Sequence, residues 1–229
     1  ADEARASFDS ENGLGGVDKN ASVARVAMSC EALRTTTRMM HAIAWLLNQH
    51  LPEETALHIA NSMPIRDVEF FWKKSLQVRA LFANRGANGI DGTLSSALGI
   101  AQVRGSTVLL TGDLAFLHDR NGLLLAGNPH FHGRLTVVLV NNNGGGIFEN
   151  LPIADTNPPF EEFFATPQHI DFQKLSEAHG IPHYRPENWD AFVELISKVA
   201  DTPIRIIEIQ TDRKKDSAFR RKILKLPQT

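Results

Sequence analysis

Two short polar stretches, each directly after an apolar run, hold the side chains that could do chemistry. They are Gly112-Asp113-Leu114 and Asn141-Asn142-Asn143-Gly144. Asp113 offers a carboxylate and Asn142 an amide oxygen, which are hard ligands that suit Mg²⁺ when phosphate and water complete its shell. The glycines let backbone groups approach a ligand, and exposed N–H groups in such turns bind anions. The two stretches therefore favour a diphosphate bound through magnesium.

The residue types alone leave the role of Asp113 open. An Asp directly after a strand is often the N-cap of the following helix, so the capping and metal-binding interpretations both fit this position. A dinucleotide site is not favoured, because no G-x-G-x-x-G sequence follows a predicted strand.

The elements that could position these stretches alternate along the chain between strand-like and helix-like patterns. Such alternation predicts an α/β fold with a doubly wound parallel sheet, covered by helices on both faces. Ligands of such sheets bind outside the carboxyl ends of the strands, so both polar stretches should face one crevice. The predicted strands are 56–60, 78–83, 107–111, 135–140 and 204–209. The predicted helices are 24–47, 65–72, 93–103, 121–126, 171–179, 189–200 and 216–224.

Three further features of the sequence are not expected to take part in catalysis. Residues 149–170, rich in Pro and Phe, are predicted to form an ordered loop or lid rather than a regular element. The Lys and Arg residues at 213–225 indicate a solvated helix face rather than a binding patch. His130 and His132 are interpreted as solvated loop histidines, because no third metal ligand is near them in the sequence.

Composition narrows the class of protein. The chain has 229 residues, 42% of them hydrophobic, and a net charge of -2, which does not suit a nucleic-acid-binding surface. Its apolar stretches are too short for a membrane span. A single cysteine, Cys30, excludes a disulfide framework and fits a reducing compartment such as the cytoplasm. The first residues carry no signal-peptide pattern and no initiator Met, so the chain is expected to be a piece of a longer protein.

Longer motifs carry a family resemblance that extends over about residues 39–210. Gly112-Asp113-Leu114 and the later Asn141-Asn142 resemble the thiamine diphosphate (ThDP) motif of ThDP-dependent enzymes. The run at 84–92, Asn-Arg-Gly-Ala-Asn-Gly-Ile-Asp-Gly, and the run at 61–66, Asn-Ser-Met-Pro-Ile-Arg, narrow the match. With them the chain resembles the MenD family, the 2-succinyl-5-enolpyruvyl-6-hydroxy-3-cyclohexene-1-carboxylate synthases.

The resemblance implies a ThDP diphosphate-binding (PP) domain that binds ThDP with Mg²⁺ or Mn²⁺. The implied metal ligands are Asp113, Asn142 and the carbonyl of Gly144, although any of Asn141, Asn142 and Asn143 could be the ligating asparagine. Ile90 is implied as the apolar prop beneath the bent cofactor. The full implied set of cofactor-binding residues is Ile90, Gly112, Asp113, Leu114, Asn142 and Gly144.

The implied reaction belongs to menaquinone or phylloquinone biosynthesis. A transferase of this family decarboxylates 2-oxoglutarate and adds the succinyl carbanion equivalent to isochorismate. Both substrates carry carboxylates, which Arg binds in a forked geometry. Without the resemblance, Arg66 and Arg85 would be interpreted as solvated or salt-bridged. For Ile147 and Phe148, packing within the lid and lining of the substrate pocket stay equally open. The implied substrate-binding residues are Asn61, Ser62, Arg66, Arg85, Ile147 and Phe148.

The resemblance also implies a missing part. In the family, the glutamate that activates the cofactor lies on a separate pyrimidine-binding domain, and no such domain fits before residue 35. We therefore expect residues 1–34 to form a linker or N-terminal arm and helix, and residues 35–229 to be the C-terminal ThDP domain of a homo-oligomer, dimer or tetramer. The location would be the cytoplasm, or a plastid in a photosynthetic eukaryote.

Two alternatives stay open: an acetolactate synthase-like carboligase, and a non-catalytic PP-domain binding module.

Overall fold

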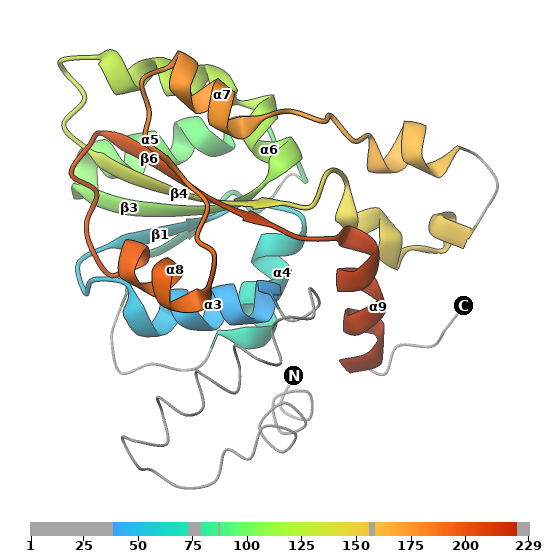
Figure 1. Cartoon of the computed structure of the whole chain (residues 1–229). Helices are drawn as coiled ribbons and strands as arrows, with labels where there is room; N and C mark the ends of the chain where they lie inside the picture. Colours follow the sequence, from blue (N-terminus) through green and yellow to red (C-terminus); the bar gives the residue numbers. More distant parts are fainter. Residues whose placement is uncertain (1–38, 73–78, 87, 156–158, 224–229) are drawn as a thin grey trace, which may run out of the picture.

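A computed structural model describes residues 39–72, 79–86, 88–155 and 159–223. Within these residues, six parallel strands form one sheet in the order β2-β1-β3-β4-β6-β5. The strands β1, β3, β4 and β6 are labelled in Figure 1. The strands are β1 (Ala56–Ile59), β2 (Leu81–Ala83), β3 (Ser106–Gly112), β4 (Arg134–Asn141), β5 (His183–Tyr184) and β6 (Ile204–Gln210). The doubly wound parallel sheet predicted from the sequence is thereby confirmed.

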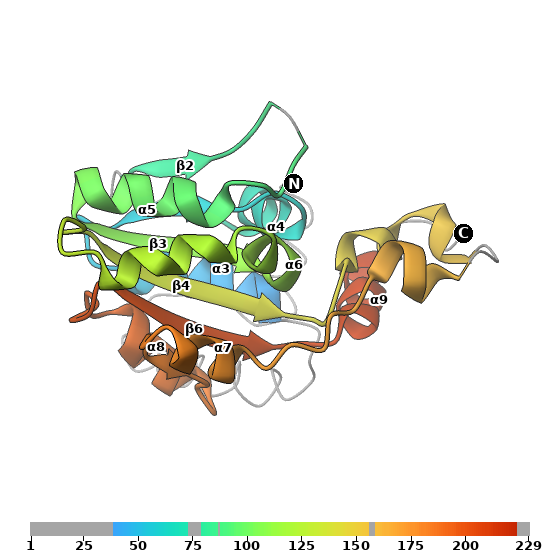
Figure 2. The ribbon, with the colours of Figure 1, turned by 90° about the horizontal axis from the view of Figure 1, so that it is seen from above.

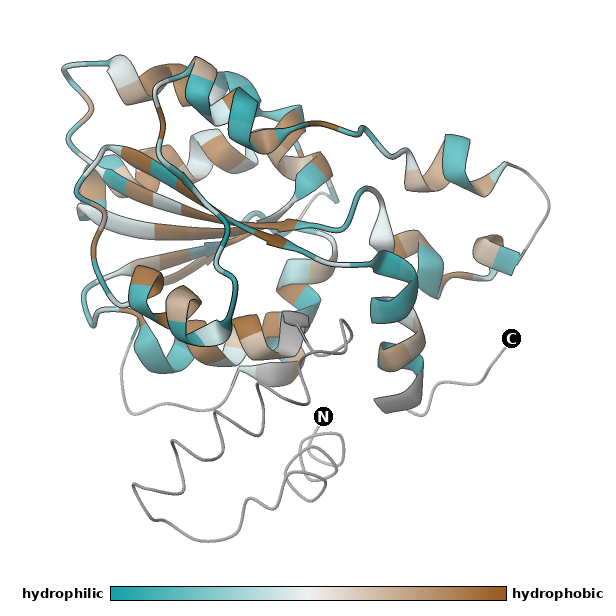
Figure 3. Ribbon diagram, viewed as in Figure 1, coloured by the Kyte–Doolittle hydropathy of each residue, from teal (hydrophilic) through white to brown (hydrophobic). Residues whose placement is uncertain are grey.

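Central strands are buried on both faces, and alternate side chains enter two separate core clusters. In β3, Val108 and Leu110 join one cluster while Leu109 joins the other. The hydropathy colouring of Figure 3 shows the same arrangement, with apolar strands inside and polar helix faces outside. Continuous apolar strands are expected of a parallel sheet that helices cover on both sides.

Two groups of helices cover the two faces (Figures 1 and 2). The first group packs on the cluster that holds Val108, and it comprises α3 (Met39–His50), α4 (Met63–Phe71) and α8 (Trp189–Ile196). The second group packs on the cluster that holds Leu109, and it comprises α5 (Thr93–Arg104), α6 (Asp113–His118), the 3₁₀ helix η1 (Arg120–Gly127) and α7 (Phe172–Ala178). No helix of the described ranges is long and apolar enough to cross a membrane.

Side-chain caps fix the starts of two of these helices. Asp171 accepts a hydrogen bond from the Lys174 amide at the start of α7, and Asn188 accepts one from the Ala191 amide at the start of α8. Each such cap stabilises a helix by about 1 kcal/mol.

Several elements differ from the sequence-based expectation. The helix after β3 begins at Asp113 itself, and the predicted helix at 121–126 is the 3₁₀ helix η1. The two-residue strand β5 was not predicted. A loop or lid was expected at 149–170, but the described residues between 146 and 165 contain three short helical segments, η2 (Gly146–Asn150), η3 (Pro152–Asp155) and η4 (Glu161–Ala165). The last helix, α9, spans Arg213–Ile223. Of the helix predicted at 24–47, residues 24–38 lie outside the described ranges.

The strand order creates the crevice that the sequence predicted. Strand β1 pairs with β2 on one side and with β3 on the other, so the connections that leave β1 and β3 diverge. In open α/β sheets a ligand binds at this point, outside the carboxyl ends of the strands. Helix α9 and the segment from η2 to η4 extend beyond these strand ends (Figure 2).

Candidate functional site

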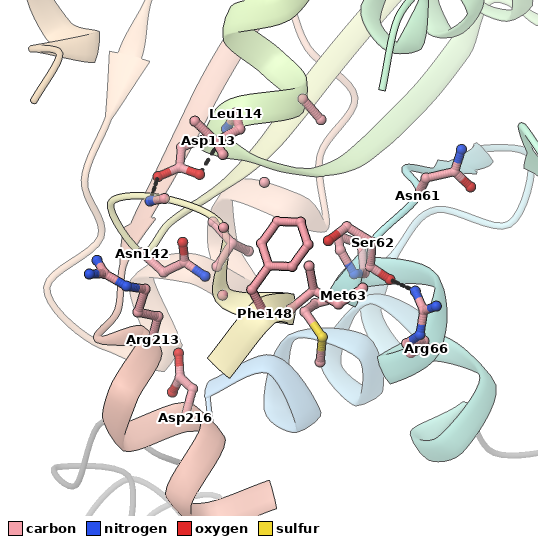
Figure 4. A pocket seen from close by; sticks show the side chains of 18 of the residues that line it. Asn61, Ser62, Met63, Arg66, Asp113, Leu114, Asn142, Phe148, Arg213 and Asp216 are labelled. Carbon is pink, nitrogen blue, oxygen red and sulfur yellow. Dashed lines mark hydrogen bonds between the residues drawn. The ribbon is translucent and has the colours of Figure 1, made fainter. Parts of the chain in front are cut away.

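A cavity of about 390 Å³ opens at this point of the sheet. Its walls are the segments that follow β1, β2, β3 and β4. One face of α9 completes them (Figure 4). Of the twelve cofactor- and substrate-binding residues predicted from the resemblance, those that line the cavity are Asn61, Ser62, Arg66, Ile90, Gly112, Asp113, Leu114, Asn142, Gly144, Ile147 and Phe148. The cavity therefore brings together four stretches that are far apart in the sequence, at 61–66, 90, 112–114 and 142–148.

Asp113 is a buried carboxylate held by backbone amides. One oxygen accepts a hydrogen bond from the Gly144 amide at 2.8 Å, and the other accepts one from the Leu114 amide at 2.8 Å (Figure 4). Burial raises the pKa of Asp113 to about 6, although these amide hydrogen bonds act to lower it. Gly112, not Asp113, is the N-cap residue of α6, so the capping interpretation does not describe this side chain. A buried carboxylate in a cavity wall is well placed for a cation, whose charge would favour the ionised form.

The three consecutive asparagines take three different roles. Asn141 is engaged: its amide donates to Glu208 at 2.7 Å, and its oxygen accepts from the Asn143 backbone at 3.2 Å. Asn143 has a positive φ of 58° and its side chain lies 3.4 Å from His169. Asn142 lines the cavity, and its buried side-chain oxygen has no hydrogen-bond partner among the described residues. Of the three, Asn142 is the one that lines this cavity and has a buried, unpartnered side-chain oxygen among the described residues.

The turn that carries Asn142 requires its glycine. Gly144 has φ 133°, and an added Cβ would collide with the carbonyl oxygen of Ala165. The neighbouring Gly145 amide donates to the same carbonyl at 2.7 Å, so the end of η4 packs directly against the turn. No group of three or more His, Cys, Asp or Glu side chains lies together in the described ranges. A cation here would therefore depend on Asp113 with amide and carbonyl oxygens, a set that fits Mg²⁺.

The stretch after β1 forms the opposite wall. The Asn61 amide donates to the Gly89 carbonyl at 2.6 Å, which joins this stretch to the segment that carries Ile90. Ser62 has φ 73°, a conformation that is uncommon outside glycine and is typical of functional sites. Arg66, one turn into α4, donates to the Ser62 carbonyl at 2.6 Å (Figure 4). The contacts hold both segments in place beside the cavity.

Arg85 is the predicted substrate-binding residue that lies elsewhere. Its side chain is exposed, and among the described residues it does not belong to the cavity lining. Its proposed contact with substrate stays a prediction. His130 and His132 are exposed residues of a turn before β4.

Ile147 and Phe148 were left open between lid packing and lining of the substrate pocket, and their role toward a substrate stays a prediction. Both line the cavity. Phe148 also packs edge-on against Phe164, with ring centroids 5.8 Å apart, and Phe164 stacks on Phe160 at 5.9 Å. An apolar wall of this kind is suited to keep water from a bound ligand.

Helix α9 supplies the site residues that the sequence reasoning missed. The cavity is lined by Arg213, Asp216, Ser217 and Arg220. The interpretation of the Lys and Arg cluster as a solvated face was therefore wrong for Arg213 and Arg220. Burial raises the pKa of Asp216 to about 7, and one of its buried oxygens has no hydrogen-bond partner in the part of the chain described. The available signal was spacing: these four residues stand at i, i+3, i+4 and i+7, which is one face of a helix.

Comparisons with known proteins place this geometry in context. Residues 69–208 match the family described as "Thiamine pyrophosphate enzyme, C-terminal TPP binding domain", and residues 1–60 match a second family described as "Protein of unknown function (DUF1465)". Among solved structures, the chain resembles a thiamine diphosphate-dependent 4-hydroxybenzoylformate decarboxylase from Rhodococcus jostii. That likeness has a TM-score of 0.60 at 19% identity, and it covers 76% of this chain and 32% of that one.

Among curated proteins, the chain is similar to two 2-succinyl-5-enolpyruvyl-6-hydroxy-3-cyclohexene-1-carboxylate synthases. It is 53% identical over 182 residues to that of Rippkaea orientalis, covering 80% of this chain and 30% of that protein. It is 58% identical over 179 residues to that of Trichormus variabilis, which covers 78% of this chain and 30% of that protein. The chain thus spans about 30% of the length of these relatives.

These similarities confirm the resemblance inferred from the motifs at 61–66 and 84–92. The division of the chain at residue 35 and the individual roles of the site residues stay predictions. Because the family match covers more than half of its 229 residues, this chain belongs to the thiamine pyrophosphate enzymes and carries their C-terminal TPP-binding domain.

Proposed function

We propose that this chain is the diphosphate- and magnesium-binding part of a 2-succinyl-5-enolpyruvyl-6-hydroxy-3-cyclohexene-1-carboxylate synthase. The complete enzyme would decarboxylate 2-oxoglutarate and join the remaining four-carbon unit to isochorismate. One observation carries the proposal: the unsatisfied Asn142 oxygen and the buried Asp113 carboxylate line the same cavity. The identity to synthases of this name supports the choice of reaction.

In this proposal three oxygens hold the cation. They are a carboxylate oxygen of Asp113, the side-chain oxygen of Asn142 and the backbone carbonyl of Gly144. Gly112 and Leu114 bring the backbone of the β3–α6 turn against the diphosphate, and Ile90 supports the cofactor from its apolar side. When bound, ThDP supplies the electron-accepting centre for decarboxylation and carbon–carbon bond formation.

The remaining lining residues are proposed to bind and orient the substrates. Arg66 offers a guanidinium to a substrate carboxylate, with Asn61 and Ser62 beside it as polar partners. Ile147 and Phe148 form an apolar wall that keeps water from the reacting carbon. The side chain of Arg85 is exposed and lies outside the cavity lining. Only the family resemblance supports its proposed role as a second carboxylate-binding residue.

The site is proposed to be completed by a pyrimidine-binding domain of the same enzyme within a homo-oligomer. The chain matches only 30% of the length of its relatives. In the family it resembles, the activating glutamate belongs to that other domain, on the far end of the cofactor. The chain alone is therefore expected to bind the cofactor weakly and to lack synthase activity.

The test assays the purified chain with ThDP, Mg²⁺, 2-oxoglutarate and isochorismate, before and after addition of a pyrimidine-domain fragment. Carbon dioxide release and adduct formation only with the fragment would support the proposal. Full turnover by the chain alone would refute the split site. Preference for pyruvate over 2-oxoglutarate would favour an acetolactate synthase-like enzyme. Mg²⁺-dependent ThDP binding without turnover in the complete assembly would favour a binding module.

A further inference from the structure

Arg213, near the start of α9, joins three segments that come from different parts of the chain. Its side chain is only 11% exposed. One guanidinium nitrogen donates to the Asn143 carbonyl at 2.8 Å, and Nε donates to Glu149 of η2 at 2.9 Å. The remaining nitrogen pairs with Glu161 of η4. The planar fork of Arg can hold several acceptors at fixed angles, which a Lys cannot do.

The first of these contacts fixes a single peptide unit from both sides. The carbonyl of Asn143 and the amide of Gly144 belong to the same planar group and point in opposite directions. Arg213 holds that carbonyl, and Asp113 holds that amide at 2.8 Å. The peptide dipole thus lies between a cation and an anion, with each end facing the opposite charge. The orientation of this unit determines where the neighbouring Asn142 and Gly144 oxygens point.

The other two contacts attach the cavity wall to the same guanidinium. Glu149 directly follows Phe148, which lines the cavity. Glu161 begins η4, whose last residue, Ala165, accepts a hydrogen bond from the Gly145 amide and lies closely against Gly144. Neither core cluster includes a residue of α9 in the described part of the chain. The contacts of Arg213 therefore serve the cavity rather than the sheet.

We propose that Arg213 is a positioning residue for the cation–diphosphate site, acting through the Asn143–Gly144 peptide. The inference rests on the function proposed above. Loss of Arg213 frees that peptide to rotate, so Mg²⁺ and ThDP must order it on binding, and their apparent affinity falls. The sheet and its helices keep their packing.

The experiment uses the complete synthase that contains this chain. Arg213→Met removes all three contacts. Arg213→Lys keeps the positive charge but lacks the planar guanidinium that binds several acceptors at once. Two matched controls lie on the same helix: Arg221→Met removes a 2.6 Å bond to the Glu149 carbonyl, and Lys214→Met removes a 3.1 Å pair with Glu161. The readouts are Mg²⁺ titration at fixed ThDP by calorimetry, thermal unfolding without cofactor, and hydrogen exchange of the Gly144 amide.

We expect Arg213→Met to raise the Mg²⁺ concentration for half-saturation roughly tenfold or more, as the loss of a charge-assisted bond would. Arg213→Lys should give a smaller rise, and each control less than about threefold. Exchange of the Gly144 amide should quicken in both Arg213 variants and not in the controls. The unfolding midpoint without cofactor should move by only a few degrees.

Three results would overturn the inference. They are wild-type Mg²⁺ affinity in Arg213→Met, an equal loss in Arg221→Met, or a loss matched by a general drop in the unfolding midpoint. If Arg213→Met does not fold, Arg213→Lys decides by the same criteria. If the unsubstituted synthase binds no Mg²⁺ and ThDP, the proposed function fails. The hydrogen exchange of Gly144 still decides whether Arg213 holds the peptide.

Discussion

The two sides of the cavity are held by different forces. Asp113 and Asn142 follow β3 and β4, whose side chains fill both core clusters. Helix α9 faces them, and its ion pairs join Arg213 to two glutamates and Arg220 to Asp67, beside neutral hydrogen bonds from Ser217. The Arg213–Glu149 and Arg220–Asp67 pairs are largely buried, so salt screens them little, but each charge lost its hydration on burial, a cost that apolar packing does not carry. The groups proposed to bind the cofactor are thus fixed by the core, and the wall that encloses them is held by charge.

The strongest test of this contrast removes one partner of a buried pair. Asp67 on α4 has a side chain with 0% exposure, and Arg220 is its partner. Arg220→Met leaves a buried carboxylate without compensation, which costs about 3–5 kcal/mol of folding free energy. Urea unfolding would measure this. The double variant Asp67→Leu with Arg220→Met should recover most of the loss. A single variant as stable as the parent would show that the pair does not hold α9.

The second test measures how much the buried charge of Glu208, on strand β6, stabilises the sheet side of the cavity. Burial alone would raise the pKa of Glu208, but hydrogen bonds from His183, Asn141 and Arg185 outweigh it and lower the pKa to about 2. A depressed carboxylate pKa adds stability above its unfolded value near 4.5, and that stability is lost as the pH falls towards about 2. Glu208→Gln should therefore destabilise the protein at pH 7 by up to about 3 kcal/mol.

The difference between Glu208→Gln and the parent should shrink steadily between about pH 4.5 and pH 2, as followed by denaturant unfolding at each pH. Gln keeps an acceptor for Asn141, so the fold should survive. A difference that stays constant over this range would mean that Glu208 is not ionised in the folded state.

A third test addresses the cofactor side directly. Asp113→Ala should weaken Mg²⁺-dependent ThDP binding roughly a hundredfold or more, since even residues that only support a metal ligand are worth ten- to a hundredfold. The fold should change little, because the side chain faces the cavity rather than the core. Calorimetry in the complete enzyme and circular dichroism would measure both. Asp113→Asn is the matched control for size. Unchanged ThDP affinity in Asp113→Ala would exclude the metal role.

The smallest effects are expected on KM, when each of two arginines is replaced by Ala. Arg66 lines the cavity, whereas Arg85 is exposed. Arg66→Ala should raise KM for an acidic substrate about ten- to a hundredfold, the worth of a lost charge-assisted bond. Arg85→Ala should raise KM by about tenfold at most. Steady-state kinetics with 2-oxoglutarate and isochorismate would separate them. Normal substrate binding by an Arg66→Ala variant of lowered stability would make Arg66 a structural residue.

The sequence predicted the fold well where local patterns and burial agree. The apolar runs that became β3 and β4 are buried on both faces, so their composition marked them clearly. The polar residues at their ends were found because a strand end is a recognisable position. The two-residue β5 is too short to show any period. The start of α6 at Asp113 was missed because no polar cap separates it from β3.

The α9 side of the cavity could not be predicted in the same way. Residues 213–223 carry many charges, and sequence patterns equate a charged face with a solvated one. Here the inward face itself is charged, because its partners Asp67 and Glu149 are distant in the sequence and their positions depend on the fold. Only the spacing of Arg213, Asp216, Ser217 and Arg220 marked that face, and spacing alone does not tell which side a helix buries.

If Asp113 binds the proposed cation, the two hydrogen bonds that its carboxylate accepts from backbone amides affect how fast that cation binds. Both carboxylate oxygens are already oriented, by Gly144 and Leu114, before any ion arrives. Such a preorganised receptor needs no slow rearrangement of its own. The rate of association should then follow how readily the ion sheds water, and Mg²⁺ dehydrates reluctantly. A divalent ion that exchanges water faster should therefore enter the same receptor sooner, whichever ion is finally held more tightly.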